Sequence, residues 1–188
     1  MARQRIEHHA TTTADPATVY ALLRDGAGWP SWSPIDSFAL ERPGADEPEG
    51  VGAVRRFRNG RVTGHDEIVE LVPDRRFSYT HTSSLPVRNY RADVDLEPIA
   101  GGTAIRWVSA FDPKVPGTGW LVRRALDGFV AKLTEGLAAR ATADVAARAR
   151  DVSPRASAVR SGGGASARCR PGPGRRPCGT RPCRRCRP

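Results

Sequence analysis

The sequence predicts an α+β domain: an antiparallel sheet of about seven strands packed on one long C-terminal helix, with two short helices after the first strand. Two observations carry this prediction. Between residues 53 and 111, apolar and polar residues alternate in successive short segments, as in half-buried strands. From 118 to 147 the apolar residues recur every three or four positions, as in an amphipathic helix. Roughly 30 residues of helix span roughly 45 Å, so this helix must run along most of the sheet.

The N-terminal elements are expected in the order strand, helix, helical turn and strand. The first strand covers residues 3–12. Asp15 is a suitable N-cap for the helix that follows, and Pro16 suits its first position. The motif GWPSWSPI then predicts one helical turn that presents two indole side chains, those of Trp29 and Trp32. A second strand is expected from residue 35 to about 41.

The rest of the sheet follows a polar loop, ERPGADEPEGVG. The dipeptide Asn59-Gly60 is a strong hairpin signal and predicts that these two residues form the turn between two strands. The later strands are expected over residues 77–82, 88–97 and 103–111. Gly128 and Gly136 interrupt the long helix, which indicates either a close approach of another backbone or space beside the helix.

Charge divides the chain into two parts. The net charge of the chain is +10, but residues 151–188 hold ten Arg and one Asp, and residues 1–150 hold 20 basic and 19 acidic residues. The body is therefore nearly neutral. It has no run of apolar residues of membrane-spanning length and no secretory signal, so we expect a cytoplasmic protein without a membrane span. The Ala/Arg/Gly/Pro-rich composition fits a bacterium of high GC content.

The C-terminal segment, residues 151–188, is rich in Arg, Pro, Gly and Cys and has no large apolar residue, so it is expected to be a disordered tail after a domain of residues 1–150. It contains all four cysteines, Cys169, Cys178, Cys183 and Cys186. Only the last two have zinc-knuckle spacing, so we predict no metal site. An arginine arm that binds nucleic acid is the alternative. We favour a disordered appendage, of the kind that a frameshift or read-through would produce.

The body resembles a known superfamily. The segments that carry the resemblance are DPATVYALLRDGAGWPSWSPI, GVGAVRRFRNG, LPVRNYRADVDLEP, GGTAIRW and PGTGWLVRRALDGF, in this order. Together they are similar to the START-like (SRPBCC, Bet v 1-like) superfamily, in its polyketide cyclase/dehydrase and lipid-transport branch. The resemblance implies a helix-grip fold, in which a curved sheet wraps the long helix around an apolar cavity. It also implies a hydrophobic ligand of lipid or aromatic polyketide type.

Alternation along the strands predicts which side chains face that cavity. Phe77, Tyr79 and His81 share one face of their strand, and the residues that flank them share the other. The same rule places four residues of the next strand and four of the last strand inward. The ligand-binding residues expected from the apolar faces and the helix stripe are Trp29, Trp32, Phe57, Phe77, Tyr79, Tyr90, Val94, Ile105, Trp107, Phe111, Leu126, Phe129 and Leu133. Trp29 and Trp32 either gate the cavity or simply pack the short helix.

Two polar residues join this set through the predicted hairpin. If Asn59-Gly60 is the turn, Arg55 and Asp66 lie on the inner face as a diagonal pair. Such a pair either orients a polar group of a ligand or forms an ordinary edge-strand salt bridge, and we favour the salt bridge.

The functional prediction is binding of a hydrophobic small molecule, without a cofactor. The alternative is a cyclase or dehydratase in which Tyr79, His81 or Tyr90 moves protons on the bound ligand. A third hypothesis is association with nucleic acid through the tail. The body lacks a glycine-rich phosphate loop, a nucleophile triad and the Cys/His pairs of a Rieske centre. The oligomeric state does not follow from the sequence.

Overall fold

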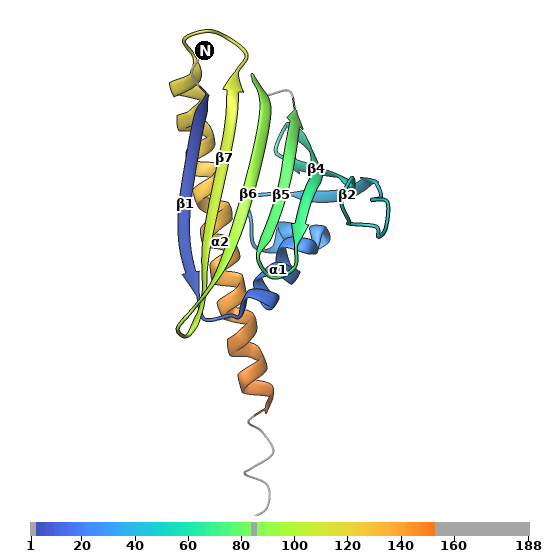
Figure 1. Cartoon of the computed structure of the whole chain (residues 1–188), viewed down its shortest axis with the longest axis vertical. Helices are drawn as coiled ribbons and strands as arrows, with labels where there is room; N and C mark the ends of the chain where they lie inside the picture. Colours follow the sequence, from blue (N-terminus) through green and yellow to red (C-terminus); the bar gives the residue numbers. More distant parts are fainter. Residues whose placement is uncertain (1–2, 84–85, 153–188) are drawn as a thin grey trace, which may run out of the picture. The chain divides into compact units, whose positions relative to one another are not determined.

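The structure is a computed structural model that describes residues 3–83 and 86–152. Within them it contains seven strands and three helical segments. Their order is β1 (Gln4–Thr12), α1 (Pro16–Arg24), the 3-10 helix η1 (Gly26–Ser31), β2 (Ser37–Arg42), β3 (Val54–Asn59), β4 (Val62–Val72), β5 (Arg76–Ser83), β6 (Val87–Ile99), β7 (Gly102–Pro113) and α2 (Gly119–Val152). The predicted α+β helix-grip class is confirmed (Figure 1).

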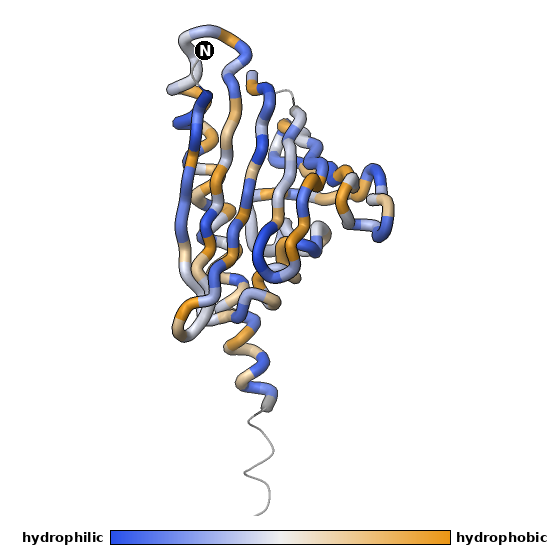
Figure 2. Tube along the Cα trace, in the orientation of Figure 1, coloured by the Kyte–Doolittle hydropathy of each residue, from blue (hydrophilic) through white to orange (hydrophobic). Residues whose placement is uncertain are grey.

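All seven strands form one antiparallel sheet in the order β1-β7-β6-β5-β4-β3-β2. The register shifts between Ile68 and Glu70 and again between Arg88 and Arg91. Bulges of this kind bend a strand and increase its twist, so they account for the curvature of the sheet. Apolar and polar residues alternate along the strands (Figure 2). The predicted inner faces are buried: Tyr90, Ala92, Val94 and Leu96 on β6, and Ile105, Trp107, Ser109 and Phe111 on β7.

Helix α2 runs behind β1 and β7 (Figure 1). The hydroxyl groups of Thr12 and Thr142 are 2.9 Å apart, which joins the end of β1 to the C-terminal half of α2. In the middle of β1, His8 Nε2 lies 3.2 Å from Asp127 Oδ1. The helix continues to Val152 rather than ending near residue 147, because the Ala- and Arg-rich segment that follows has good helix propensity.

The short helices close one end of the sheet. Asp15 caps α1 as predicted, since its Oδ1 accepts a hydrogen bond of 2.7 Å from the backbone N–H of Thr18. In η1 the indole N–H of Trp29 donates to the backbone oxygen of Leu23, at 3.1 Å. Trp29 and Leu23 are buried in the apolar core. The predicted strand from residue 35 begins only at Ser37, and Ile35 precedes it as a buried residue.

The β3–β4 hairpin turns one residue later than predicted. Asn59 pairs with Val62, so the two loop residues are Gly60 and Arg61. Of the two, only Gly60 has a positive φ, 58°. In two-residue hairpin loops with a single positive φ, that angle belongs to the first loop residue, which is usually glycine. Asp36 Oδ2 accepts a hydrogen bond from the Gly60 N–H at 2.5 Å and holds the turn in place.

The tail predicted over residues 151–188 lies outside the described residues, except that 151 and 152 belong to α2. Disorder, zinc binding and nucleic-acid binding in this segment therefore stay predictions. None of the described helices combines the length and the apolar composition that crossing a membrane requires. The cytoplasmic location stays a prediction.

An ion-pair cluster on the outer face of the sheet makes the stability of the domain depend on pH. Arg106 Nε donates to Glu7 Oε1 at 2.7 Å and Arg5 Nη2 lies 2.7 Å from Glu7 Oε2. The hydrogen bond from Arg106, aided by Arg5, lowers the pKa of Glu7 to about 2. The folded pKa lies below the unfolded one, so this stabilisation is present above about pH 4.5 and is lost as the pH falls toward 2.

We therefore expect Glu7→Gln to lose less stability than the natural protein between pH 4.5 and pH 2. Urea unfolding at several pH values measures this. Glu97→Gln, at an exposed position on β6, is the matched control and should keep the natural pH dependence. Parallel pH profiles for the natural protein and Glu7→Gln would contradict the prediction.

Candidate ligand pocket

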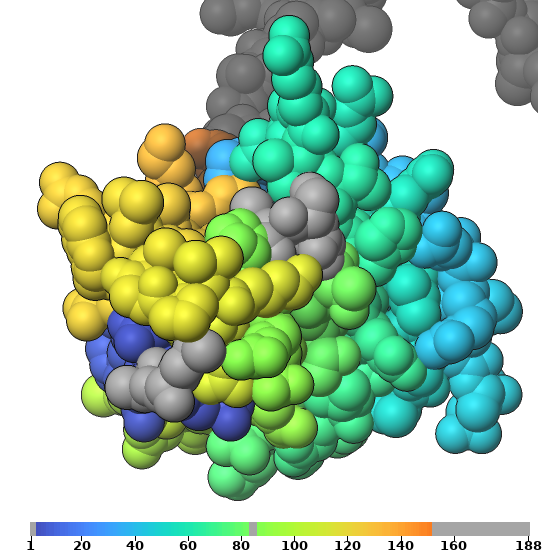
Figure 3. Space-filling model, turned by 90° about the horizontal axis from the view of Figure 1, so that it is seen from above, coloured from blue at the N-terminus to red at the C-terminus, as the bar shows by residue number. Residues whose placement is uncertain are grey.

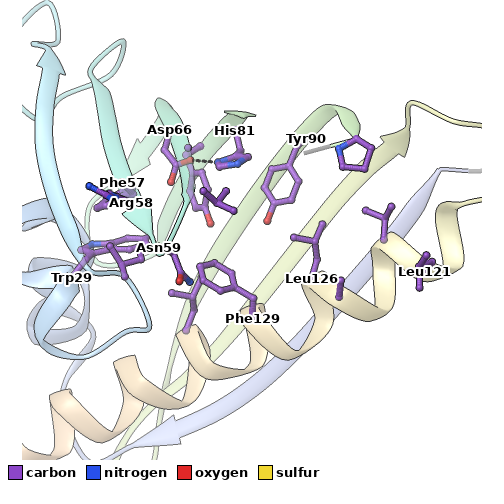
Figure 4. Close-up of a pocket in the computed structure, with 18 residues that line it drawn as sticks. Trp29, Phe57, Arg58, Asn59, Asp66, His81, Tyr90, Leu121, Leu126 and Phe129 are labelled. Carbon is purple, nitrogen blue, oxygen red and sulfur yellow. Dashed lines mark hydrogen bonds and ion pairs between the residues drawn. The ribbon is translucent and has the colours of Figure 1, made fainter. Parts of the chain in front are cut away.

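A pocket of about 440 Å³ lies between the N-terminal half of α2 and strands β3 to β6 (Figure 4). It exists because α2 packs against β1 and β7 while the curved sheet continues beyond them to β2. The residues that line it come from six strand and helix elements, β3 to β6, η1 and α2, and from two connecting segments. They are Trp29, Ile35, Phe57, Arg58, Asn59, Val62, Gly64, Asp66, Tyr79, His81, Pro86, Tyr90, Leu121, Val122, Ala125, Leu126, Phe129 and Leu133.

An aromatic cluster forms the end of the pocket next to η1. Trp29 stacks on Phe57 with ring centroids 5.0 Å apart, and it meets Tyr79 edge-on at 6.4 Å. The ring of Trp32 is tilted against that of Trp29, with centroids 5.0 Å apart, and does not line the pocket. The hydrogen bond from Trp29 to α1 and these ring contacts hold the surface rigid, as a preformed apolar site requires.

Helix α2 changes role along its length. Its middle part is packed, with Leu137 and Ala141 fully buried. Near Gly136 the backbone oxygen of Trp32 approaches so closely that a Cβ would overlap it. At Gly128 nothing lies within 4 Å of the position of a Cβ. Each of the two predicted explanations therefore applies to one glycine. Another backbone approaches closely at Gly136, where the helix is packed, and there is open space beside Gly128, nearer the N-terminus of the helix.

The pocket opens at the end of the molecule where α2 begins. Leu121 and Val62 both line it, and they are 54% and 39% exposed. Asn59 and Pro86 line the same region and are also exposed. Figure 3 looks onto this end, with the β3–β4 hairpin in turquoise and the start of α2 in yellow. The pocket therefore borders solvent at this end of the domain, where exposed side chains line it.

One strongly polar group of side chains interrupts the apolar wall. His81 Nδ1 lies 2.5 Å from Asp66 Oδ1, and their side chains are 20% and 10% exposed. The two residues are direct neighbours across β4 and β5. Asp66 and His81 lie together on the strand side of the pocket and face Leu126 and Phe129 of α2 (Figure 4).

The two tyrosines of the pocket are poor proton acceptors. Burial raises the pKa of Tyr90 to about 12 and raises the pKa of Tyr79 well above its ordinary value. Both phenols are therefore protonated at neutral pH. The Tyr90 hydroxyl already donates to Ser109 Oγ at 2.9 Å. Of the three predicted catalytic candidates, His81 is the one whose ring is hydrogen-bonded to a carboxylate, that of Asp66.

Arg55 does not pair with Asp66 and does not line the pocket, contrary to the prediction. The later hairpin turn places the two residues directly opposite each other, but the guanidinium extends toward α1. Nη1 donates to the Leu23 oxygen at 2.9 Å, and Nη2 donates to the Arg24 oxygen at 2.6 Å. Nη2 also lies 2.6 Å from Glu49 Oε2. Arg55 thus satisfies the carbonyl groups at the end of α1.

The predicted ligand-binding residues divide into two groups. Eight of them line the pocket: Trp29, Phe57, Asp66, Tyr79, Tyr90, Leu126, Phe129 and Leu133. The other seven do not: Trp32, Arg55, Phe77, Val94, Ile105, Trp107 and Phe111. The apolar members of the second group are buried in the core, because alternation predicts the inner face of a strand but not which part of that face a helix covers. Direct contact of any of these residues with a ligand stays a prediction.

Sequence reasoning missed several residues of the mouth. Arg58, Asn59 and Val62 lie on the hairpin, and Leu121, Val122 and Ala125 lie on the first turns of α2. Val122 belongs to the apolar stripe between residues 118 and 147, so the stripe itself could have identified it. Asn59 was assigned to the turn, and its place in β3 depends on the one-residue shift of the hairpin.

Comparison with known proteins agrees with this geometry. The model of a family described as polyketide cyclase / dehydrase and lipid transport matches residues 3–150. No curated protein matches the chain.

Three solved structures illustrate the similarity in fold. A START superfamily protein from Mycobacterium smegmatis is 13% identical, with a TM-score of 0.63, over 73% of this chain and 96% of that one. Ara h 8.0201 is 17% identical, with a TM-score of 0.63, over 76% and 99%. A protein from Thermobifida fusca is 24% identical, with a TM-score of 0.61, over 73% and 92%. At these identities the likeness establishes the fold.

Proposed function

The chain belongs to the polyketide cyclase/dehydrase and lipid transport family, and we propose that it binds one hydrophobic small molecule, of lipid or aromatic polyketide type, between α2 and strands β3 to β6. The observation that carries the proposal is the pocket of about 440 Å³, whose lining is mainly aromatic and aliphatic. This volume lies within the range of roughly 300–1,000 Å³ that is usual for small-molecule sites.

The lining supports an apolar ligand more than a charged one. The wall that α2 contributes consists of Leu121, Val122, Ala125, Leu126, Phe129 and Leu133. A charged group placed against this wall would lose its hydration without a compensating partner. Arg58 lines the pocket at the hairpin, where its Nε donates to the Gly60 oxygen at 2.9 Å. It is exposed, so it adds no charge to the interior of the pocket.

Native mass spectrometry of the full chain, purified from the organism that makes it, tests the proposal directly. We expect a reproducible added mass that disappears on denaturation and corresponds to a lipid or an aromatic compound. If the protein carries no added mass and also fails to bind the neutral fluorescent probe N-phenyl-1-naphthylamine, the proposal is wrong.

Filling the pocket should abolish binding without unfolding the protein. Leu126 is half-buried on the α2 wall, so a tryptophan in its place occupies ligand space instead of core. We expect Leu126→Trp to weaken binding of N-phenyl-1-naphthylamine at least tenfold, which corresponds to about 1.4 kcal/mol. Arg124→Trp, at an exposed position of α2 outside the lining, is the matched control and should bind normally. Equal affinities for the two variants would contradict the assignment of the site.

A second candidate function is a cyclase or dehydratase that acts in the same pocket. The observation that favours it is the hydrogen-bonded pair of Asp66 and His81 on the pocket wall, because a histidine oriented by a carboxylate is a common general base. Turnover of an aromatic polyketide substrate that is lost in His81→Phe while binding persists would support the enzyme. Binding without any turnover in the natural protein would support ligand binding without catalysis.

A further inference from the structure

In the Asp66–His81 pair, one imidazole nitrogen is hydrogen-bonded to the carboxylate, and the other has no hydrogen bond to a described residue. A carboxylate can only accept hydrogen bonds, so the contact of 2.5 Å between Asp66 Oδ1 and His81 Nδ1 requires the proton to be on Nδ1. In a neutral imidazole the other nitrogen, Nε2, is then an acceptor. Among the described residues, none hydrogen-bonds His81 Nε2.

The backbone opposite the pair leaves room for the ring. Gly64 on β4 also lines the pocket, and a Cβ at this position would overlap Cε1 of His81. On β6, the ring of Tyr90 packs against the imidazole edge-on, with centroids 5.4 Å apart. The imidazole is therefore held by a carboxylate, an aromatic ring and the lack of a side chain at Gly64, which together fix its orientation.

Apart from Arg58 at the mouth of the pocket, the charged groups nearest the pair lie on β3 and in the segment before it. On β3, Arg55 interacts favourably with the Asp66 carboxylate and is itself paired with Glu49. Tyr79 and Tyr90 are protonated phenols, and the Tyr90 hydroxyl is turned to Ser109. The part of α2 that faces the pocket contributes only apolar side chains. Within the part of the chain that the structure describes, His81 Nε2 is thus an acceptor without a hydrogen-bond partner, in a pocket whose α2 wall is apolar.

We propose that the natural ligand carries a hydroxyl group, as an alcohol, phenol or enol does, and that this group donates a hydrogen bond to His81 Nε2. This inference rests on the proposed binding function and specifies its ligand class. A ligand without a donor would bury Nε2 without a hydrogen bond, and an unsatisfied buried polar group costs about 1–3 kcal/mol. The site therefore discriminates between two apolar molecules of the same shape by the presence of one hydroxyl group.

Three naphthalene probes of nearly equal size test the proposal on the full chain: 2-naphthol, 2-methylnaphthalene and 2-naphthaldehyde. Their affinities are measured by equilibrium dialysis at pH 7.5. We expect 2-naphthol to bind about five- to tenfold more tightly than 2-methylnaphthalene, as one net hydrogen bond predicts. The aldehyde, which only accepts hydrogen bonds, should gain nothing over 2-methylnaphthalene.

Two variants assign the preference to the pair. His81→Phe should bind 2-methylnaphthalene normally, which shows that it is folded, and should lose the preference for 2-naphthol.

Asp66 acts through His81 as a positioning residue. In Asp66→Asn the amide can donate to Nδ1, which moves the imidazole proton to Nε2 and should abolish the preference for 2-naphthol over 2-naphthaldehyde. A merely structural role of Asp66 would weaken all three probes equally. His65→Phe, at a half-buried site on β4 that pairs with Glu41 and does not line the pocket, is the control and should behave as the natural protein.

The outcomes separate this inference from the function on which it rests. If all three probes bind with equal affinity, the hydroxyl anchor is wrong and the hydrophobic pocket stands. If the aldehyde binds best, Nε2 carries the proton and the anchor is also wrong. If none of the probes binds and Leu126→Trp has no effect on N-phenyl-1-naphthylamine, both the anchor and the proposed function fail. The ¹⁵N resonance of His81 Nε2 is an independent readout, since a protonated nitrogen in the free protein would overturn the proposal.

Discussion

Replacing Arg55 with methionine is expected to lower the free energy of unfolding by about 3 kcal/mol, the usual cost of removing one partner of a buried ion pair. The guanidinium is 1% exposed and makes three close contacts, to the Leu23 oxygen, the Arg24 oxygen and the Glu49 carboxylate. It also lies 5.0 Å from the ring centroid of Phe77. Methionine fills much of the volume but leaves the two carbonyl groups and the carboxylate without this donor.

Urea unfolding followed by circular dichroism measures the effect. Burial lowers the pKa of Arg55, and the carboxylates of Glu49 and Asp66 oppose this shift. Because an arginine side chain stays charged in proteins, the guanidinium is a permanent donor at the end of α1. Arg56→Met, the next residue on β3 and exposed, is the matched control and should change stability by less than about 0.5 kcal/mol. Equal midpoints for the two variants would show that Arg55 does not hold α1 to the sheet.

Replacing Gly136 with alanine is expected to destabilise the protein by about 1–3 kcal/mol, as overpacking in a close-packed interior does. The added Cβ overlaps the backbone oxygen of Trp32, so either η1 or α2 must move. Backbone at the end of η1 gives way less easily than the tip of a side chain. Because η1 carries Trp29 at the end of the pocket, we also expect weaker binding of N-phenyl-1-naphthylamine.

Gly128 is the matched control within the same helix. Nothing lies within 4 Å of a Cβ at this position, so Gly128→Ala should gain about 0.5–1 kcal/mol from helix propensity alone. Thermal unfolding of the two variants therefore should shift in opposite directions. A stabilising Gly136→Ala would mean that η1 and α2 are not in contact as described.

The predictions that succeeded depended on local patterns. The period of two in YRADVDLEP placed Tyr90 and Val94 inside, and both are buried. The Asp15-Pro16 signal located the start of α1, because a cap is formed by residues only three apart. The helical stripe identified α2, although its end was misplaced by several residues, since alanine and arginine continue a helix without an apolar signal.

The pocket was predicted less completely, because its lining depends on how elements dock. Trp107 and Phe111 have the same inward pattern as Tyr79 and Tyr90, yet they lie in the packed core and not in the pocket. The difference is where α2 crosses the sheet, which no strand pattern contains. The mouth residues on the hairpin were missed because the turn is at Gly60 and Arg61.

The sequence by itself determined the family resemblance, the α+β class, the inward faces of the strands and the apolar stripe of α2, because each of these is a property of neighbouring residues. Only the tertiary structure decided the partners of the polar residues. Arg55 donates to carbonyl groups that are 31 and 32 residues away in the chain. His81 and Asp66 are 15 residues apart in the chain and meet across the neighbouring strands β4 and β5. A buried polar side chain takes whichever partner the docked elements bring within hydrogen-bond distance, and that is decided by register and packing over long separations in the chain.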